Sequence, residues 1–224
     1  MVKTFDDMWE QVHKEVEWGK YPSEEVIRFV ARNYYKFNNR KECSILDFGC
    51  GTGAIAWYLA REGFNVYGFD GSETAIEKAK KRMLDEKVKV EFSVADAGKL
   101  PYENNYFDAI IDSAVIYANK LEDIKIILKE AKRVLKPNGK IFSTGLFNSK
   151  TTGYGTGEQI EEGTYREITM GPLAHRATIH FFTVDQILDL WSELGFKNIK
   201  IDSVERTDMG GEYKVGYFMV EAQK

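Results

Sequence analysis

The chain has 224 residues, 43% of them hydrophobic and 29% charged, and a formal net charge of −4 at pH 7. These values fit one globular domain with a substantial buried core. They argue against a nucleic-acid-binding protein, because such proteins usually carry a basic face. The longest basic run here, Lys80–Arg82, falls within an expected helix, where it indicates a solvated face.

The N-terminus and the cysteines favour a cytoplasmic protein. Met1–Trp9 is charged and aromatic, without the apolar run of a signal peptide, and no stretch approaches the roughly 20 apolar residues of a membrane helix. Cys43 and Cys50 are the only cysteines, too few for a disulfide framework or a cysteine-based zinc site. With three histidines in the whole chain, no dedicated metal site is expected.

The first two-thirds of the chain predict two helices and then strands that alternate with helices. Apolar residues recur at helical spacing in Phe5–Trp18 and Ser23–Tyr35. Short apolar strands are expected at Ser44–Phe48, Asn65–Phe69, Val88–Val94, Phe107–Asp112 and Lys140–Thr144. Helices between them are expected at Thr52–Glu62, Ser72–Leu84 and Leu121–Leu135, with a tight turn at Pro137–Gly139.

The last third changes in character. Gly145–Phe182 shows no clear periodicity and carries glycines at 153, 155, 157, 163 and 171. A helix is expected over Thr183–Leu194, because its first residue, a threonine followed three positions later by glutamine, begins a capping box. Two strands, Ile199–Val204 and Gly216–Glu221, follow and are joined through a hairpin turn at Asp208–Gly211.

Strands that alternate with helices predict an α/β fold with parallel βαβ units and a sheet covered on both faces. We expect a doubly wound, Rossmann-like sheet of seven strands, preceded by N-terminal helices and finished by an antiparallel C-terminal hairpin strand. No repeat, low-complexity tract or flexible linker divides the sequence, so residues 1–224 are expected to form a single domain.

A glycine-rich loop follows the first predicted strand. Ile45–Gly53 combines an apolar strand with a G-x-G-x-G pattern that opens a helix. Glycines let the backbone turn sharply and let a ligand approach, and the helix N-terminus offers unpaired N–H groups. Alone the loop is a weak signal, because dinucleotide enzymes carry a similar G-x-G-x-x-G.

Acidic residues at three successive strand ends sharpen this signal. Asp47 lies two residues before the first glycine, placed to bond the loop or a ligand amine, while Asp70 and Asp96 end the second and third strands. Each alone could be a helix cap or a turn residue. Together with the glycine loop they predict one ligand crevice at the carboxyl ends of the strands, with Asp70 where an acid holds ribose hydroxyls.

Two further segments carry a resemblance to a known family. Leu100–Asp108 (LPYENNYFD) is similar to the "lP…fD" stretch of class I S-adenosylmethionine-dependent methyltransferases. Ala131–Lys140 (AKRVLKPNGK) is similar to their "R-x-L-K-P-G-G" turn, with Asn138 in place of the first glycine, a replacement that a turn tolerates. The chain resembles this family over roughly residues 44–144.

The resemblance implies S-adenosylmethionine as cofactor and assigns roles within this segment. By position these are Gly49, Cys50 and Gly51 for the methionine part, Asp70 and Gly71 for the ribose, Asp96 and Ala97 for the adenine, and Ser113 and Ala114 for the path to the sulfonium.

An N-terminal segment folds over the cofactor in similar enzymes, so Trp18 and Tyr21 are candidates for a lid, with ordinary core aromatics as the alternative. The expected organisation is a helical lid over 1–43, a cofactor-binding core over 44–144, a substrate-site insert over 145–182, and a C-terminal helix and hairpin over 183–224.

The methyl acceptor is expected between the N-terminal helices, the loop after the fourth strand and the insert. Tyr117 offers a hydrogen bond or a cation–π contact. The insert holds Tyr154, Tyr165, Arg166, His175, Arg176 and His180. Arginines and histidines suit an anionic or polyhydroxylated ligand, so Arg166, His175 and Arg176 are candidate substrate contacts, with surface charge as the alternative. His180, beside an ordered element, is the candidate general base, with a packed histidine as the alternative.

These features predict an enzyme that transfers a methyl group to an oxygen or nitrogen of a small polar metabolite, such as a sugar, free or nucleotide-linked, or a phosphorylated amino alcohol. A non-catalytic S-adenosylmethionine-binding module and an NAD-dependent dehydrogenase are the alternatives. The expected partner is the small-molecule acceptor, without nucleic acid or membrane, in a monomer or homodimer.

Overall fold

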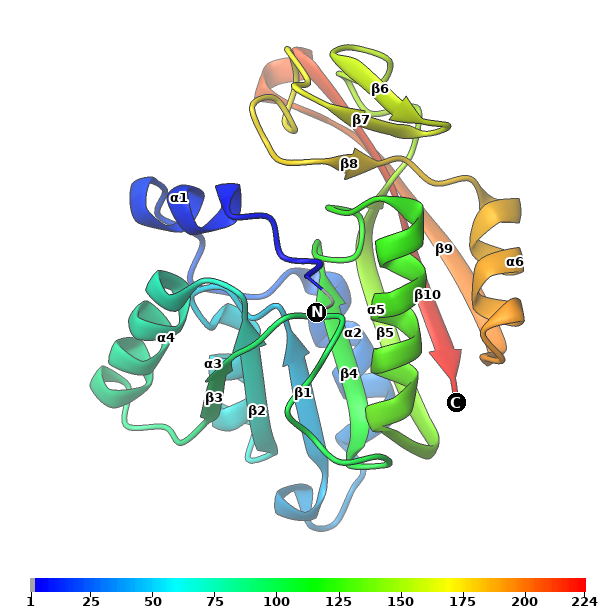
Figure 1. The fold of residues 1–224 in the computed structure, drawn as a ribbon. Coiled ribbons are helices and arrows are strands. Elements are labelled where there is room, and N and C mark those ends of the chain that lie inside the picture. Colours follow the sequence, from blue (N-terminus) through cyan, green and yellow to red (C-terminus); the bar gives the residue numbers. More distant parts are fainter. Residues whose placement is uncertain (1–2) are drawn as a thin grey trace.

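A seven-stranded sheet forms the centre of the computed structural model, which describes residues 3–224. The strand order is β3-β2-β1-β4-β5-β10-β9 (Figure 1). The strands span Ser44–Phe48 (β1), Asn65–Asp70 (β2), Glu91–Val94 (β3), Phe107–Ser113 (β4), Leu135–Phe147 (β5), Lys197–Asp208 (β9) and Tyr213–Gln223 (β10). β1 to β5 are parallel, whereas β10 runs antiparallel to both β5 and β9. The predicted fold class is therefore confirmed.

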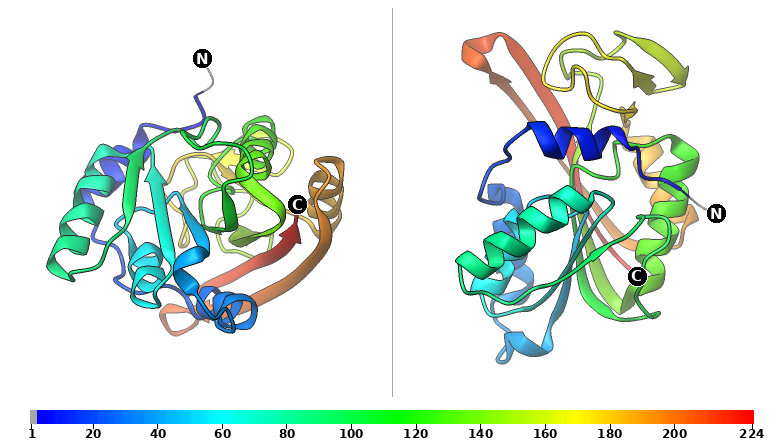
Figure 2. Two further views of the ribbon diagram at one scale, coloured as in Figure 1. Left: turned by 90° about the horizontal axis from the view of Figure 1, so that it is seen from below. Right: turned by 60° about the vertical axis from the view of Figure 1, so that its left-hand side comes forward.

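Helices cover both faces of this sheet (Figure 2). They span Met8–Glu15 (α1), Glu24–Tyr34 (α2), Ala54–Arg61 (α3), Glu73–Asp85 (α4), Leu121–Val134 (α5) and Val184–Glu193 (α6), with short 3-10 turns at Arg40–Glu42 (η1) and Met209–Gly211 (η2). α2 and α3 pack on one face, and α5 and α6 on the other. Within residues 3–224 no helix combines the length and the hydrophobicity that crossing a membrane requires.

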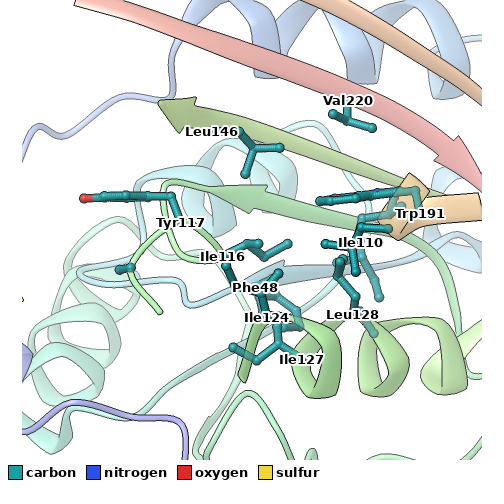
Figure 3. Close-up of a cluster of buried hydrophobic side chains, with 14 of the residues drawn as sticks. Phe48, Ile110, Ile116, Tyr117, Ile124, Ile127, Leu128, Leu146, Trp191 and Val220 are labelled. Carbon is teal, nitrogen blue, oxygen red and sulfur yellow. The ribbon is translucent and has the colours of Figure 1, made fainter. Parts of the chain in front are cut away.

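The two cores follow from strand alternation, because successive side chains of a strand point to opposite faces. In β4, Ile110 points to the core beneath α5 and α6, and its neighbour Ile111 points to the core beneath α2 and α3. Figure 3 shows Ile110 in the first core with Phe48 from β1 and Trp191 from α6. All three are almost fully buried.

The N-terminal helix is shorter than Phe5–Trp18, because side chains elsewhere bind the backbone at both of its ends. The amides of Thr4 and Phe5 donate to Asp96, and the carbonyl of His13 accepts from Lys78. The helix therefore begins later and ends earlier than predicted, with Val16 already extended at φ −108° and ψ 132°.

The segment expected to lack periodicity contains a small sheet of its own. Its strands are β6 (Glu158–Glu161), β7 (Thr164–Arg166) and β8 (Ile179–His180), paired antiparallel in that order. The strands have two to four residues each, too few for a periodic pattern in the sequence. The predicted turn at Pro137–Gly139 lies inside β5 as an irregularity, with Asn138 at φ +65°.

Arg133 of α5 anchors the loop that leads into β4. Its guanidinium donates to both carboxylate oxygens of Glu130, to the carbonyls of Leu100 and Tyr102, and to the side-chain oxygen of Asn104. These bonds use all the N–H donors that a guanidinium carries. An arginine in the "R-x-L-K-P-G-G" motif is thus explained by the loop it holds.

We predict that Arg133→Lys lowers the free energy of unfolding by about 1–2 kcal/mol, because an ammonium cannot reproduce the planar fork. Urea denaturation followed by circular dichroism measures the change. Arg28→Lys, in an exposed ion pair with Glu24, is the matched control and should change stability by less than about 0.5 kcal/mol. Equal effects at both positions would contradict this role.

Candidate functional site

A cavity of about 410 Å³ lies at the carboxyl ends of the parallel strands. The loop after β1 and the loop after β4 form its walls, and residues 4–23 pass over it. This place is the topological switch point of the sheet, where the chain leaves β1 and β4 in opposite directions and α/β folds bind ligands. The volume lies in the range of small-molecule sites.

The glycine loop has no space for side chains. Gly49 has φ +63°, and a Cβ there would lie 2.4 Å from a methyl group of Val115 in the loop after β4. Gly51 has φ +50°, and a Cβ would approach the ring of His13 to 3.4 Å. Between them, the Cys50 amide donates to the Phe69 carbonyl at 2.8 Å. The glycines are therefore needed for the approach of two loops and a helix.

Asp70 ends β2 and combines burial with unused hydrogen-bonding capacity. Its Oδ2 accepts the N–H of Gly51 and its Oδ1 accepts the N–H of Ser72, both at 2.9 Å. An ionised carboxylate has about four acceptor positions, so about half remain. Burial raises the pKa of Asp70, against the opposing effects of the Ser72 N–H and the charge of His13. Such a group, at the cavity wall, fits a ligand with two adjacent hydroxyls.

Asp47 and Asp112 are fully buried, and each orders one wall of the cavity. Asp47 accepts the Ala56 N–H at 2.8 Å, which fixes the start of α3. Asp112 accepts the amides of Val115 and Ile116 at 3.0 and 3.3 Å, which folds the loop after β4. Burial raises the pKa of both carboxyl groups to about 7.

Most of the residues assigned to the cofactor meet at this cavity. Its wall includes Trp18, Tyr21, Gly49, Cys50, Gly51, Asp70, Gly71, Ala97, Ser113 and Ala114. The structure thus brings together residues that lie up to 96 positions apart in the sequence (18 to 114). Their contacts with a cofactor stay a prediction.

Asp96 is not among the residues that line the cavity, although its neighbour Ala97 is. Its carboxylate accepts the amides of Thr4 and Phe5, the hydroxyl of Thr4 and the amide of Gly98. Burial acts to raise the pKa of Asp96, but these hydrogen bonds outweigh it, and the pKa is lowered. In the structure the Asp96 carboxylate therefore has no free acceptor position for the expected hydrogen bond from adenine.

The prediction that His180 is a general base is wrong. The side chain is fully buried, its Nδ1 lies 2.6 Å from the Thr164 hydroxyl, and its Nε2 lies 2.9 Å from the Gln186 side-chain oxygen. Burial lowers the pKa of His180. With both ring nitrogens paired inside the protein, His180 ties β7, β8 and α6 together and cannot take a proton from an acceptor.

The three predicted substrate contacts of the insert differ in how close they lie to the cavity. Arg166 pairs with Glu158 at 3.5 Å within the small sheet, and His175 is exposed at φ +56°, so neither reaches the cavity wall. Arg176, by contrast, lies over the ring of Trp18 at 5.4 Å from its centroid. Of the predicted substrate contacts in the insert, the structure therefore brings only Arg176 close to a cavity residue.

Tyr117 lines the cavity, and its hydroxyl points away from the core cluster in Figure 3. Burial raises the pKa of Tyr117 to about 12, although the positive charge of Arg176 acts in the opposite direction. The phenol therefore remains protonated near neutral pH and can donate a hydrogen bond. Its contact with the acceptor stays a prediction.

His13 was not among the predicted site residues, yet it lies at the cavity. Its ring lines the cavity between Gly51 and Asp70, only 7% of the residue is exposed, and its Nδ1 has no hydrogen-bond partner within residues 3–224. Burial lowers the pKa of His13. One signal was present: His13 follows Trp9 by four residues and so shares its helix face.

Comparisons with known proteins agree with this geometry. A family model described as "Methyltransferase domain" matches residues 45–139. A demethylmenaquinone methyltransferase from Thermotoga maritima is 31% identical over 166 residues, covering 68% of this chain and 69% of that protein. A ubiquinone biosynthesis O-methyltransferase from Pelagibacter ubique is 32% identical over 123 residues. That match covers 52% of this chain and about half, 50%, of the relative's length.

Among solved structures, a protein from Methanosarcina mazei described as a SAM-dependent methyltransferase superposes with a TM-score of 0.70 at 26% identity. The superposition covers 87% of this chain and 96% of that one. The superposition therefore extends beyond residues 45–139, the region that the family model matches.

We predict that Gly49→Ala destabilises the protein more than Gly155→Ala does. Both positions have positive φ, which costs a non-glycine residue about 1–2 kcal/mol, but a Cβ at Gly155 meets nothing within 4 Å. The collision with Val115 should add about 1–3 kcal/mol at Gly49 only. Thermal or urea unfolding measures both, and equal losses would contradict the crowding of the two loops.

The burial of His180 predicts a pH dependence of stability. Its folded-state pKa lies below the ordinary value of 6.5, so the unfolded chain takes up the proton first as pH falls. This contribution is complete above pH 6.5 and decreases below it. His180→Asn should reduce the stability difference between pH 7.5 and pH 5.5, whereas Thr164→Val, which keeps the imidazole, should retain that difference. An unchanged profile in His180→Asn would refute the assignment.

Proposed function

Because the chain belongs to the class I S-adenosylmethionine-dependent methyltransferases, we propose that it transfers a methyl group from S-adenosylmethionine to a nitrogen or oxygen of a small anionic metabolite. When bound, the cofactor supplies a methyl group already activated by a sulfonium. The task of the protein is then to hold both molecules in line and to exclude water.

The residues at the cavity fit this cofactor. Asp70 has acceptor positions left for the ribose hydroxyls, and the adjacent Gly71 lines the same cavity. Gly49 and Gly51 line the cavity, and we assign the backbone of their loop to the methionine part. Ser113, the last residue of β4, and Ala114, which follows it, are the residues that we assign to the path of the methyl group. Each assignment rests on the position of the residue at the cavity wall.

The observation that carries the acceptor class is the position of Arg176. Its guanidinium lies over Trp18, a cavity residue, and its charge acts on Tyr117. A cation over the cavity residue Trp18, together with the protonated phenol of Tyr117, suits a phosphate or carboxylate, which accepts charge-assisted hydrogen bonds from such groups. A phosphorylated amino alcohol or a nucleotide-linked sugar meets this requirement, whereas a free sugar does not.

An amine acceptor requires less of the protein than a hydroxyl does. A neutral amine carries its own nucleophilic lone pair, so alignment with the methyl group is the main need. A hydroxyl needs a base as well. Trp18, Tyr21 and Tyr117 line the same cavity, where aromatic rings stabilise the ammonium that methyl transfer to a neutral amine forms. We therefore place phosphorylated amino alcohols first among the acceptors.

The test is a screen for S-adenosylhomocysteine formation with a phosphorylated amino alcohol, a nucleotide-linked sugar, a free sugar and a quinol. We expect turnover with anionic acceptors. Arg176→Met should raise the KM for the acceptor by about 10- to 100-fold, the effect of one charge-assisted hydrogen bond, without changing S-adenosylhomocysteine affinity. Arg206→Met, which breaks an exposed pair with Asp208, is the matched control and should behave as wild type.

Three outcomes would contradict the proposal. Turnover confined to the free sugar or the quinol would reject the anionic acceptor. Cofactor binding without turnover on any acceptor would favour a non-catalytic module, and heat on titration with NAD in place of S-adenosylmethionine would favour a dehydrogenase.

A further inference from the structure

Residues 4–21, here named the strap, pass over the cofactor cavity. In Figure 2 helix α1, the ordered centre of the strap, lies across the end of α4 at the carboxyl edge of the sheet. Trp9, His13 and Trp18 of the strap contribute to the cavity wall. The strap therefore forms one wall of the cavity, and the contacts that hold the strap in place fix the position of that wall.

Asp96 holds the N-terminal end of the strap. Its Oδ1 accepts the Thr4 hydroxyl at 2.7 Å and the Gly98 amide at 2.8 Å. Its Oδ2 accepts the Thr4 amide at 2.7 Å and the Phe5 amide at 3.0 Å. A carboxylate has about four acceptor positions, and these bonds use all of them. The docked strap therefore leaves Asp96 unable to accept from a ligand amino group.

Phe5 closes the same end of the cavity. A Cβ on Gly71 would lie 2.0 Å from the Phe5 ring, which shows that the ring rests directly on this glycine. Gly71 and Ala97 both line the cavity beside Phe5. The pair Thr4 and Phe5 thus covers the nucleoside end with one aromatic ring and one set of hydrogen bonds.

A second carboxylate docks the middle of the strap. Glu10 accepts hydrogen bonds from the hydroxyls of Ser72 and Thr74 at the start of α4, and these bonds lower its pKa to about 2. Farther along, Lys78 and Arg82 of α4 donate to backbone carbonyls of the strap. The strap is therefore held by side-chain bonds at several points, and Asp96 secures its free end.

We propose that Asp96 is a positioning residue that docks the strap through Thr4 and Phe5, and that it does not recognise the adenine amino group. Closing the strap retains the nucleoside and places His13 beside Gly51 and Asp70. Docking of the strap is a property of the protein alone. Only the part of the test that measures ligand affinity rests on the proposed binding of S-adenosylmethionine.

The test compares Asp96→Asn, Thr4→Val and the control Thr4→Ser, which keeps the hydroxyl. Hydrogen exchange of residues 4–20 in the ligand-free protein reports docking. Calorimetry gives the affinity for S-adenosylhomocysteine and for S-inosylhomocysteine, in which an oxygen replaces the 6-amino group. We expect Asp96→Asn and Thr4→Val each to speed hydrogen exchange of the strap at least tenfold. Within each variant, the affinities for the two ligands should fall by the same factor.

In the same test, Thr4→Ser should match wild type, and the double variant should be no weaker than Asp96→Asn alone, because both changes break one latch. The affinity ratio of the two ligands should stay within twofold of the wild-type ratio in every variant.

A ratio that collapses toward one in Asp96→Asn alone would show that Asp96 reads the amino group, and would overturn the proposal. Unchanged exchange in Thr4→Val, which leaves Asp96 intact, would also overturn it. If wild type bound neither ligand, the proposed function would fail, yet exchange of the strap would still decide whether Asp96 docks it.

Discussion

Carboxylates at the ends of parallel strands are the constraint on which the other features of this site depend. The parallel strands bring Asp47, Asp70, Asp96 and Asp112 to one edge of the sheet, where a buried carboxylate must accept hydrogen bonds or become destabilising. Asp47 fixes the start of α3, Asp112 folds the loop after β4, and Asp96 holds the strap. Asp70, at the cavity wall, keeps acceptor positions for a ligand.

The insert supports the acceptor side from a distance. The backbone amide of His180 donates to the carbonyl of Tyr117 at 2.8 Å, so β8 fixes the loop that carries this tyrosine. The side chain of His180 then ties β8 to α6 through Gln186. The side chain of Gln186 thus binds the histidine, while its backbone N–H donates to the Thr183 hydroxyl at the start of the helix. Arg176, between β7 and β8, lies over the ring of Trp18.

Local chemistry explains what the sequence could predict. The strands, the glycine loop and Asp70 follow from periodicity and from turn geometry, which depend on neighbours in the chain. The roles of Asp96 and His180 could not be read in this way, because their partners, Thr4 and Thr164, come from other elements. A sequence does not show whether the hydrogen-bonding atoms of a carboxylate or an imidazole are free or already bound to other protein groups. The place of His13 could not be predicted for the same reason, since only docking of the strap brings this residue to Asp70.

The central claim is that Asp70 holds the ribose of S-adenosylmethionine with acceptor positions that the protein leaves free. Calorimetric titration with S-adenosylhomocysteine tests it most directly, with Asp70→Asn compared against Asp85→Asn, an exposed residue at the end of α4. Wild type and Asp85→Asn should bind equally, and Asp70→Asn should bind roughly 100-fold more weakly, as loss of a charge-assisted pair of hydrogen bonds requires. Equal affinity in Asp70→Asn would contradict the claim.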